Sequence, residues 1–500
     1  MIIPNKNSTN NSEEISLAKP LTKPLLFCAG LAAFWVIFIW NFWHKGIYAL
    51  GLNYFVFLSL LCGFFLLEIY KKVRFVVNDL FWLIPISFMI ISYLVYDNPF
   101  LKIISLILLP IIFGLFYNYL ILKDKDARHW DLNFLLKIAI RFFSFLSKVG
   151  VSTMQYLELI IPAGKNNKKI IAKVIIGIIL FLMIALTIII PLLSSADKLF
   201  SDKTAFVFDW FKAHLSSIYI YKTVNLIIFS VLIFSMLLAW SREFDYQEKP
   251  EAESSIDPII SGIVLGGILI IYLLFLWVQV GYLWIGSLPF DFKETENIVK
   301  SGFWQLLYLS ILNILIYFFT YRKTILIVQR ILAAFTLASL LLLVSAAHRM
   351  QLYVTYYGFS YEKFFASYAV MYCVILFIWL ISRLFVKSRS NILKFLAILF
   401  VCMYGLLTVL PVEQFILRAN VKLSKLNGSR IRLPELSMLS PDVLSLIKKY
   451  KNDGTLKERL DYSAPGKAEF SWDSWISEKE KIVADKKWYE RNLMNHIYLK

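Results

Sequence analysis

Repeated stretches of about twenty apolar residues constrain the fold of this chain more than any other feature. A helix rises about 1.5 Å per residue, so about twenty residues cross the hydrocarbon core of a bilayer. Such stretches lie at 25–43, 47–70, 75–96, 100–122, 170–192, 223–240, 258–285, 303–320, 325–347, 366–386 and 392–411. Hydrophobic residues make up 59% of the chain, more than the ~45–50% of soluble domains. The sequence therefore predicts an all-α, polytopic membrane helix bundle with about eleven transmembrane helices.

The pattern divides the chain into five segments. The first, 1–24, is polar and is expected to be a disordered cytoplasmic tail. Four transmembrane helices follow in 25–122, then a cytoplasmic loop in 123–169, then seven more helices in 170–411. The remainder, 412–500, is expected to be a small, soluble, helical tail. Within it, Ser440 before Pro441 is typical of a helix start.

The orientation follows from the distribution of Lys and Arg between the loops. With a cytoplasmic N-terminus, the inner segments hold 25 of these residues and the outer loops hold 10. Cytoplasmic loops carry such an excess. An odd number of helices then places the C-terminal tail outside. The same bias accounts for the net charge of +18, so we expect a lipid bilayer as partner and no nucleic acid.

The loop between the fourth and fifth stretches contains an amphipathic pattern. Its basic residues Lys137, Arg141 and Lys148 recur at helical spacing among apolar residues. This indicates a helix with a basic stripe at the inner leaflet, where anionic lipids would be its partners. The alternative is a helix packed on the bundle with a solvated basic edge. Whether 131–163 is interfacial, re-entrant or spanning is left open.

Polar residues also gather at the predicted outer ends of the helices. The candidate cluster comprises Asp197, Arg349, Tyr353, Tyr357, Gly358, Glu413, Arg418 and Asn420. Its charges could form buried ion pairs, of which we expect Asp197 with Arg349, or could bind an anionic ligand. The alternative is interfacial anchoring by tyrosines and solvated charges.

Signatures of soluble enzymes are absent from the sequence. It contains no P-loop, no G-x-G-x-x-G, no H-E-x-x-H, no C-x-x-C and no G-x-S-x-G. The five histidines are scattered and the four cysteines lie in apolar stretches. We therefore predict no catalytic residues, no metal and no cofactor.

Several short motifs follow one another along the second half of the chain. They are Leu192-Leu-Ser-Ser-Ala-Asp197 with Phe200, Arg349-Met350 with Tyr353, Tyr357-Gly358-Phe359-Ser360, Arg418 with Asn420, Leu439-Ser440-Pro441-Asp442, and Trp472 with Trp475. These motifs resemble those of a family of bacterial multi-pass membrane proteins, which is catalogued as domain of unknown function 4173 and is related to number 4153. Lys363 stands where the family usually has an arginine. The resemblance implies a bacterial inner membrane and no established activity.

Three functions remain open from the sequence. The first is a non-enzymatic envelope scaffold or sensor-like component whose outer tail has a protein partner. The second is a transporter or flippase for an anionic or lipid-like substrate, which needs a polar cavity among the helices. The third is a membrane-embedded transferase acting on lipid-linked substrates, with Asp197 or Glu413 as base.

Overall fold

All regular secondary structure in the described part of the chain is helical. The computed structural model describes residues 22–72, 81–121, 132–160, 174, 218–241, 257–283, 292–321, 324–385, 391–426, 431, 433–456 and 471–499. Within these ranges the ordered elements are helices and no β-strand occurs. The predicted all-α class is therefore confirmed.

Nine of the described helices are long and apolar enough to cross a membrane. They are α1 with η1 (Thr22–Ile39), α3 (Leu52–Tyr70), α6 (Pro99–Leu120), α12 (Ile218–Trp240), α13 (Pro258–Leu283), α14 (Phe292–Thr320), α15 (Leu326–Tyr357), α16 (Tyr361–Phe385) and α17 (Ile392–Val409). A shorter apolar helix, α5 (Leu83–Val95), falls within the third expected stretch. The expected helix at 170–192 lies outside the described residues except for Val174. These helices make the chain a polytopic membrane protein.

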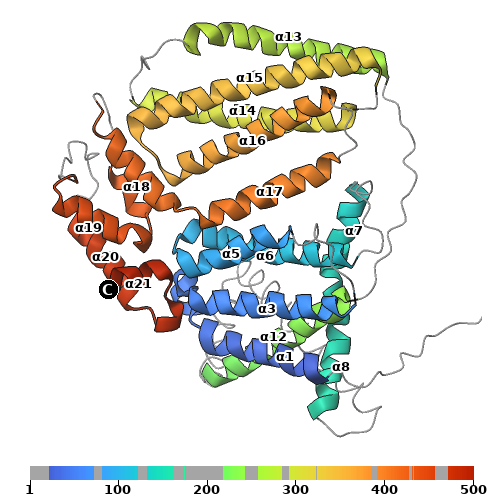
Figure 1. The fold of residues 1–500 in the computed structure, drawn as a ribbon, viewed down its shortest axis with the longest axis vertical. Helices are drawn as coiled ribbons and strands as arrows, with labels where there is room; N and C mark the ends of the chain where they lie inside the picture. The colour runs from blue at the N-terminus through green and yellow to red at the C-terminus, as the bar shows by residue number, and fades with distance from the viewer. Residues whose placement is uncertain are drawn as a thin grey trace, which may run out of the picture.

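The long helices form two groups that meet at α17 (Figure 1). Helices α13 to α16 stack on one side of α17, and α1, α3, α5, α6 and α12 lie on the other. A Cβ atom on Gly405 of α17 would lie 2.7 Å from the Cβ of Pro85 on α5. Small residues at helix interfaces allow such a close approach of two backbones. Gly405 therefore fixes where the two groups join.

Two opposite ends of the bundle carry different structures (Figure 1). At the loop end, α7 (Leu132–Phe143), η4 (Ser144–Lys148) and α8 (Val149–Ile160) run across the group of helices that contains α1, α3, α6 and α12. The indole of Trp240 donates to the carbonyl of Phe142 at 3.1 Å, which ties α12 to this end. The C-terminal helices cover the other end, called the tail end below.

The tail is a chain of short helices that packs on the bundle. Its elements are α18 (Val412–Leu423), η6 (Leu433–Met438), η7 (Pro441–Val443), α19 (Leu444–Asn452), α20 (Trp472–Ala484), η8 (Trp488–Glu490) and α21 (Leu493–Leu499). The Ser440 hydroxyl caps η7 by accepting from the amide of Asp442 at 3.2 Å. Buried tail residues such as Leu444 and Trp472 belong to the same hydrophobic core as α1, α3, α5 and α6. The tail is therefore continuous with the bundle in its packing.

Candidate functional site

Two predicted residues, Gly358 and Asn420, meet at the tail end. Gly358 ends α15 with a φ of 74°, in the left-handed region that favours glycine. The Asn420 side chain on α18 forms two hydrogen bonds with the backbone of the next residue, Phe359. Its oxygen accepts from the Phe359 N–H at 2.6 Å, and its nitrogen donates to the Phe359 carbonyl at 2.8 Å. A Cβ on Gly358 would lie 2.6 Å from the Asn420 Oδ1. The absence of a side chain at Gly358 thus allows both the turn and the close approach of Asn420 from the tail.

The predicted tyrosines, Tyr353 and Tyr357, are buried in the last turns of α15 with their ring centroids 5.1 Å apart. The Lys363 ammonium lies 4.6 Å from the ring centroid of Tyr353 and donates to the Gly358 carbonyl at 3.1 Å. A cation at the C-terminus of a helix satisfies carbonyls that have no partner within the helix. These contacts join α15 to α16 and describe a packing role.

Two other predicted residues, Arg349 and Arg418, take no part in the hydrogen bonds described above. Arg349 is half-buried on α15, and Arg418 is exposed on α18. Asp197 lies outside the described residues, so the expected pairing of Asp197 with Arg349 stays a prediction.

Glu413 is buried where three elements meet, with 3% of its surface exposed. One carboxylate oxygen accepts from the Tyr361 hydroxyl at the start of α16. The other accepts from the amide of Ser440, at 2.9 Å, and from its hydroxyl. Burial raises the pKa of Glu413 to about 7, although the hydrogen bonds from Ser440 and Tyr361 oppose that shift. Glu413 therefore links α18, α16 and η7 and titrates near neutral pH.

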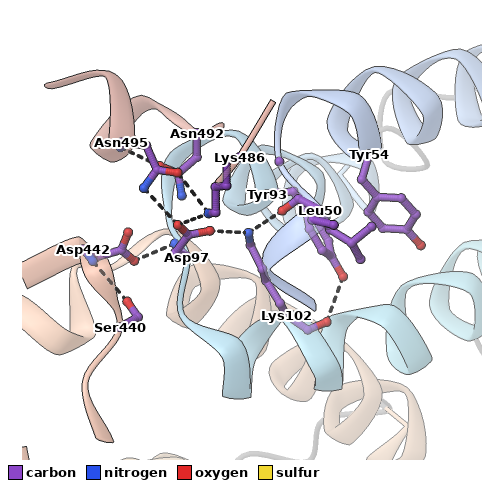
Figure 2. Close-up of polar contacts among 12 residues, drawn as sticks. Leu50, Tyr54, Tyr93, Asp97, Lys102, Ser440, Asp442, Lys486, Asn492 and Asn495 are labelled. Atoms are coloured by element: carbon purple, nitrogen blue, oxygen red, sulfur yellow. Dashed lines mark hydrogen bonds and ion pairs between the residues drawn. The ribbon is translucent and has the colours of Figure 1, made fainter. Parts of the chain in front are cut away.

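Asp97 forms the centre of a buried charged cluster that the sequence analysis missed (Figure 2). It lies between α5 and α6 and is fully buried. The Lys102 ammonium donates to one of its oxygens at 2.9 Å. The Lys486 ammonium and the Asn495 amide, at 2.9 Å, donate to the other. One carboxylate thus joins the bundle to two elements near the C-terminus.

Both lysines are buried and each has a further partner. Lys102 also donates to the Leu50 carbonyl, and Lys486 donates to the Asn495 side-chain oxygen at 3.0 Å. Burial lowers the pKa of Lys486, and the charge of Asp97 opposes the shift. Burial acts to raise the pKa of Asp97, but the charges of Lys102 and Lys486 outweigh it and hold the pKa at about 2. Asp97 is therefore ionised at neutral pH.

Asp442 of η7 completes this cluster. Its Oδ2 accepts from the backbone amide of Asp97 at 2.6 Å, whereas its Oδ1 has no hydrogen-bond partner among the described residues. Burial, followed by the charges of Asp97 and Glu413, raises the pKa of Asp442 well above its usual value. The hydrogen bond from the backbone amide of Asp97 and the charge of Lys102 oppose this shift.

These five residues, Asp97, Lys102, Glu413, Asp442 and Lys486, are called the junction cluster below. A second contact lies beside it, where Lys45 of α2 (Phe42–Lys45) approaches the buried Glu490 carboxylate at 3.2 Å. The backbones also touch, because the amide of Leu52 donates to the carbonyl of Arg491 at 3.2 Å. The C-terminal end of the tail is thus bound to the link before α3.

The basic stripe at the loop end is divided between two environments. Arg141 is half-buried and donates to the Asn118 side-chain oxygen at 2.6 Å and to the Trp240 carbonyl at 3.3 Å. Lys137 is exposed and Lys148 is half-buried. Exposed apolar side chains of α7 and η4 lie in the same segment: Leu136, Ile140, Phe143 and Leu146. Arg141 therefore packs on the bundle, whereas part of the apolar surface of α7 faces outward.

The junction cluster is suited to holding charge and a proton at the contact between bundle and tail. Among the described residues, no group of three or more His, Cys, Asp or Glu side chains could hold a metal ion. The carboxylates of Asp97 and Glu413 already accept hydrogen bonds on both oxygens. The geometry is that of a contact by which the tail docks on the bundle, and one of its residues, Glu413, titrates near neutral pH.

The bundle, with its buried charges at one end, defines a polytopic helical membrane protein. The family model described as "Domain of unknown function (DUF4153)" matches residues 83–450. The chain therefore belongs to this family, which the motif resemblance gave as the relative of number 4173. The matched range includes all of the junction cluster except Lys486. No curated protein and no solved structure matches the chain.

Proposed function

We propose that this chain is a non-enzymatic scaffold or sensor-like component of the bacterial cell envelope, in which the C-terminal tail binds the partner. The observation that carries the proposal is the fully buried Asp97 carboxylate, which binds Lys102 of the bundle and Lys486 of the tail. Removing either partner of a buried ion pair leaves an uncompensated charge. A partner that shifts the tail would therefore change the energy of the bundle itself.

The proposed location is the inner membrane, with the N-terminus in the cytoplasm and the tail outside. The excess of Lys and Arg in the predicted inner segments supports this orientation. The placement of α7 and the tail at opposite ends of the bundle also supports it (Figure 1). An outward tail would face the envelope, where a scaffold or sensor needs it.

A transporter or flippase is the alternative. It needs a polar cavity among the helices, and polar groups do lie between α13, α14 and α15. Asn313 accepts from the Tyr272 hydroxyl at 2.7 Å and donates to the Ser339 hydroxyl at 2.9 Å. These buried groups therefore satisfy one another, as packing contacts do. A transferase with Glu413 as base is less favoured, because both oxygens of that carboxylate hold the tail in place.

A photoreactive residue at exposed tail positions would test the proposal in cells. Met438 is 74% exposed and Trp488 is 65% exposed, so each can contact a partner without disturbing the tail. We expect a discrete cross-linked envelope component at one of them. Asp97→Asn should weaken this adduct because it releases the tail. Asp473→Asn, which alters an exposed pair with Lys451, should leave the adduct unchanged.

The same position reports which side of the membrane the tail occupies. A cysteine replacing Met438 should react with an impermeant thiol reagent in intact spheroplasts. Labelling only after lysis would contradict the proposed orientation. No adduct at either position, combined with substrate flux in proteoliposomes of the purified chain, would reject the scaffold in favour of the transporter.

A further inference from the structure

Helices α7 and η4 present apolar side chains to the outside of the molecule. Leu136, Ile140 and Phe143 follow one another at steps of four and three residues, which places them on one face of α7. Leu146 of η4 is exposed as well, and each of these four residues is between 58% and 63% exposed. They are called the outward face below. Contact with water is unfavourable for such a surface, so the outward face requires an apolar partner.

The opposite side of α7 fixes how this helix lies on the bundle. Phe134 and Ile138 are buried and pack in one cluster with Tyr119, near the end of α6. The carbonyl of Phe142 accepts from the indole of Trp240, the last residue of α12, at 3.1 Å. α7 and η4 thus lie beside the ends of two transmembrane helices, and they run across these helices in Figure 1. A helix in that position lies along the membrane surface.

Basic side chains accompany the outward face. Lys137 is exposed on α7, and the half-buried Lys148 is the last residue of η4. The exposed Lys72 lies at the same end of the bundle, because its ammonium donates to the carbonyl of Ser241, the residue after α12, at 3.2 Å. α7 and η4 contain no Asp or Glu. The surface therefore combines apolar side chains with positive charge.

We propose that α7 and η4 bind anionic phospholipids of the leaflet at the loop end. The outward face contacts the acyl chains, and Lys137 and Lys148 bind the phosphate groups, as basic amphipathic helices do at membrane surfaces. Arg141 is directed to the bundle instead, because its guanidinium donates to Asn118 and to the Trp240 carbonyl. With the orientation proposed above, this leaflet is the cytoplasmic one. The lipid contact itself depends neither on that orientation nor on the role of the tail.

Photo-cross-linking of the intact protein tests the lipid contact. The full chain is placed in nanodiscs of equal amounts of phosphatidylglycerol and phosphatidylcholine, with a benzophenone amino acid at Ile140 or at Phe143. Benzophenone inserts into C–H bonds, so mass spectrometry should find phospholipid adducts at both positions. The same amino acid at Asp473, whose side chain is 72% exposed on the tail helix α20, should give none. Absence of lipid adducts at both Ile140 and Phe143 would overturn the proposal and leave α7 as a helix with a solvated edge.

The ratio of the two lipids in these adducts tests the charges. One lysine near an anionic surface contributes about fivefold in affinity, so phosphatidylglycerol should be enriched over phosphatidylcholine. Lys137→Gln and Lys148→Gln should each lower this enrichment about fivefold. Lys451→Gln, which removes a partly exposed lysine of the tail, is the matched control and should leave it unchanged. Equal adducts of the two lipids with all lysines intact, or an unchanged ratio in the double variant Lys137→Gln with Lys148→Gln, would refute the binding of anionic headgroups.

Two further measurements separate this surface from a structural effect and from a protein contact. Arg141→Gln should lower the melting temperature, because it removes the bond to Asn118, but it should keep the lipid ratio. A ratio that falls in Arg141→Gln as far as in Lys137→Gln would contradict the division of the basic residues, and the comparison with Lys451→Gln stands by itself if Arg141→Gln does not fold. In cells, an adduct at Phe143 with a protein or a second copy of the chain, in place of lipid, would overturn the proposal.

Discussion

Replacing Asp97 by asparagine should release the tail from the bundle. The substitution is nearly isosteric, but it removes the one carboxylate among the described residues that forms ion pairs with both Lys102 and Lys486. Two buried ammonium groups are then left without their carboxylate. Breaking a buried pair in this way typically costs about 3–5 kcal/mol. Because Lys486 belongs to the tail, we expect that cost to appear as easier opening of the tail.

Hydrogen exchange measures this opening locally. Amides of α21 exchange when the tail opens, so a loss of about 3–5 kcal/mol should speed their exchange by roughly a hundredfold to several thousandfold. Amides in the middle of α15 should change much less, since they lie away from the junction cluster. The measurement therefore distinguishes release of the tail from general destabilisation.

Asp473→Asn is the matched control in the same tail. Its salt bridge with Lys451 is exposed, with 36% of the lysine side chain and 72% of the aspartate side chain accessible. Exposed pairs contribute about 0–1 kcal/mol, so exchange in α21 should hardly change. If Asp97→Asn accelerates α21 no more than Asp473→Asn does, the junction cluster does not hold the tail. Adding Lys486→Met to Asp97→Asn should recover part of the loss, because contacting residues are not additive.

Two further predictions concern pH and the α15–α18 contact. Glu413 has a folded-state pKa of about 7, above the usual 4.5, so its contribution to docking is complete below about pH 4.5 and falls as pH rises through about 7. Glu413→Gln should reduce this loss in α21 exchange measured from pH 5 to pH 8, and an unchanged slope would contradict the assignment. Gly358→Ala should lower the melting temperature, because the residue has a φ of 74° and the new Cβ would lie 2.6 Å from the Asn420 side chain. Asn420→Ala removes the collision but also both hydrogen bonds with Phe359, so Gly358→Ala should cost less in the Asn420→Ala background than in the native chain. An equal cost in both backgrounds would show that the collision contributes nothing.

The fold class could be predicted from the sequence because the pattern that indicates it depends only on the composition and length of the apolar stretches. A stretch of twenty apolar residues has few alternatives to a transmembrane helix, whatever its neighbours are. A helix start was also predictable where local chemistry decides it, as with Ser440 before Pro441. These features arise within a few residues of the chain. They do not depend on which distant segments come together. The end of α15 was not predictable, because the apolar stretch ends at 347 and the helix continues to Tyr357.

The junction cluster was not readable, because its members are far apart in the sequence. Asp97 and Lys102 are close in sequence, but Lys486 and Asp442 lie more than three hundred residues away. Asp97 beside Asn98 resembles an ordinary helix start, and Lys486 is one of many charged residues in the tail. The available signal was Lys102, a lysine near the start of an apolar stretch. A charge at such a position indicates a buried partner, but the sequence does not say which one.

The use of charges at this junction has a physical consequence for the tail. An apolar surface of similar area would hold the tail at least as well, since burying an ion pair often gains little net stability. It would also tolerate small shifts in register. The Asp97 carboxylate instead requires Lys102, Lys486 and Asn495 to arrive together, because each missing donor leaves a buried polar group without a partner. We therefore expect docking of the tail to be close to all-or-none, as the sensing role proposed above requires.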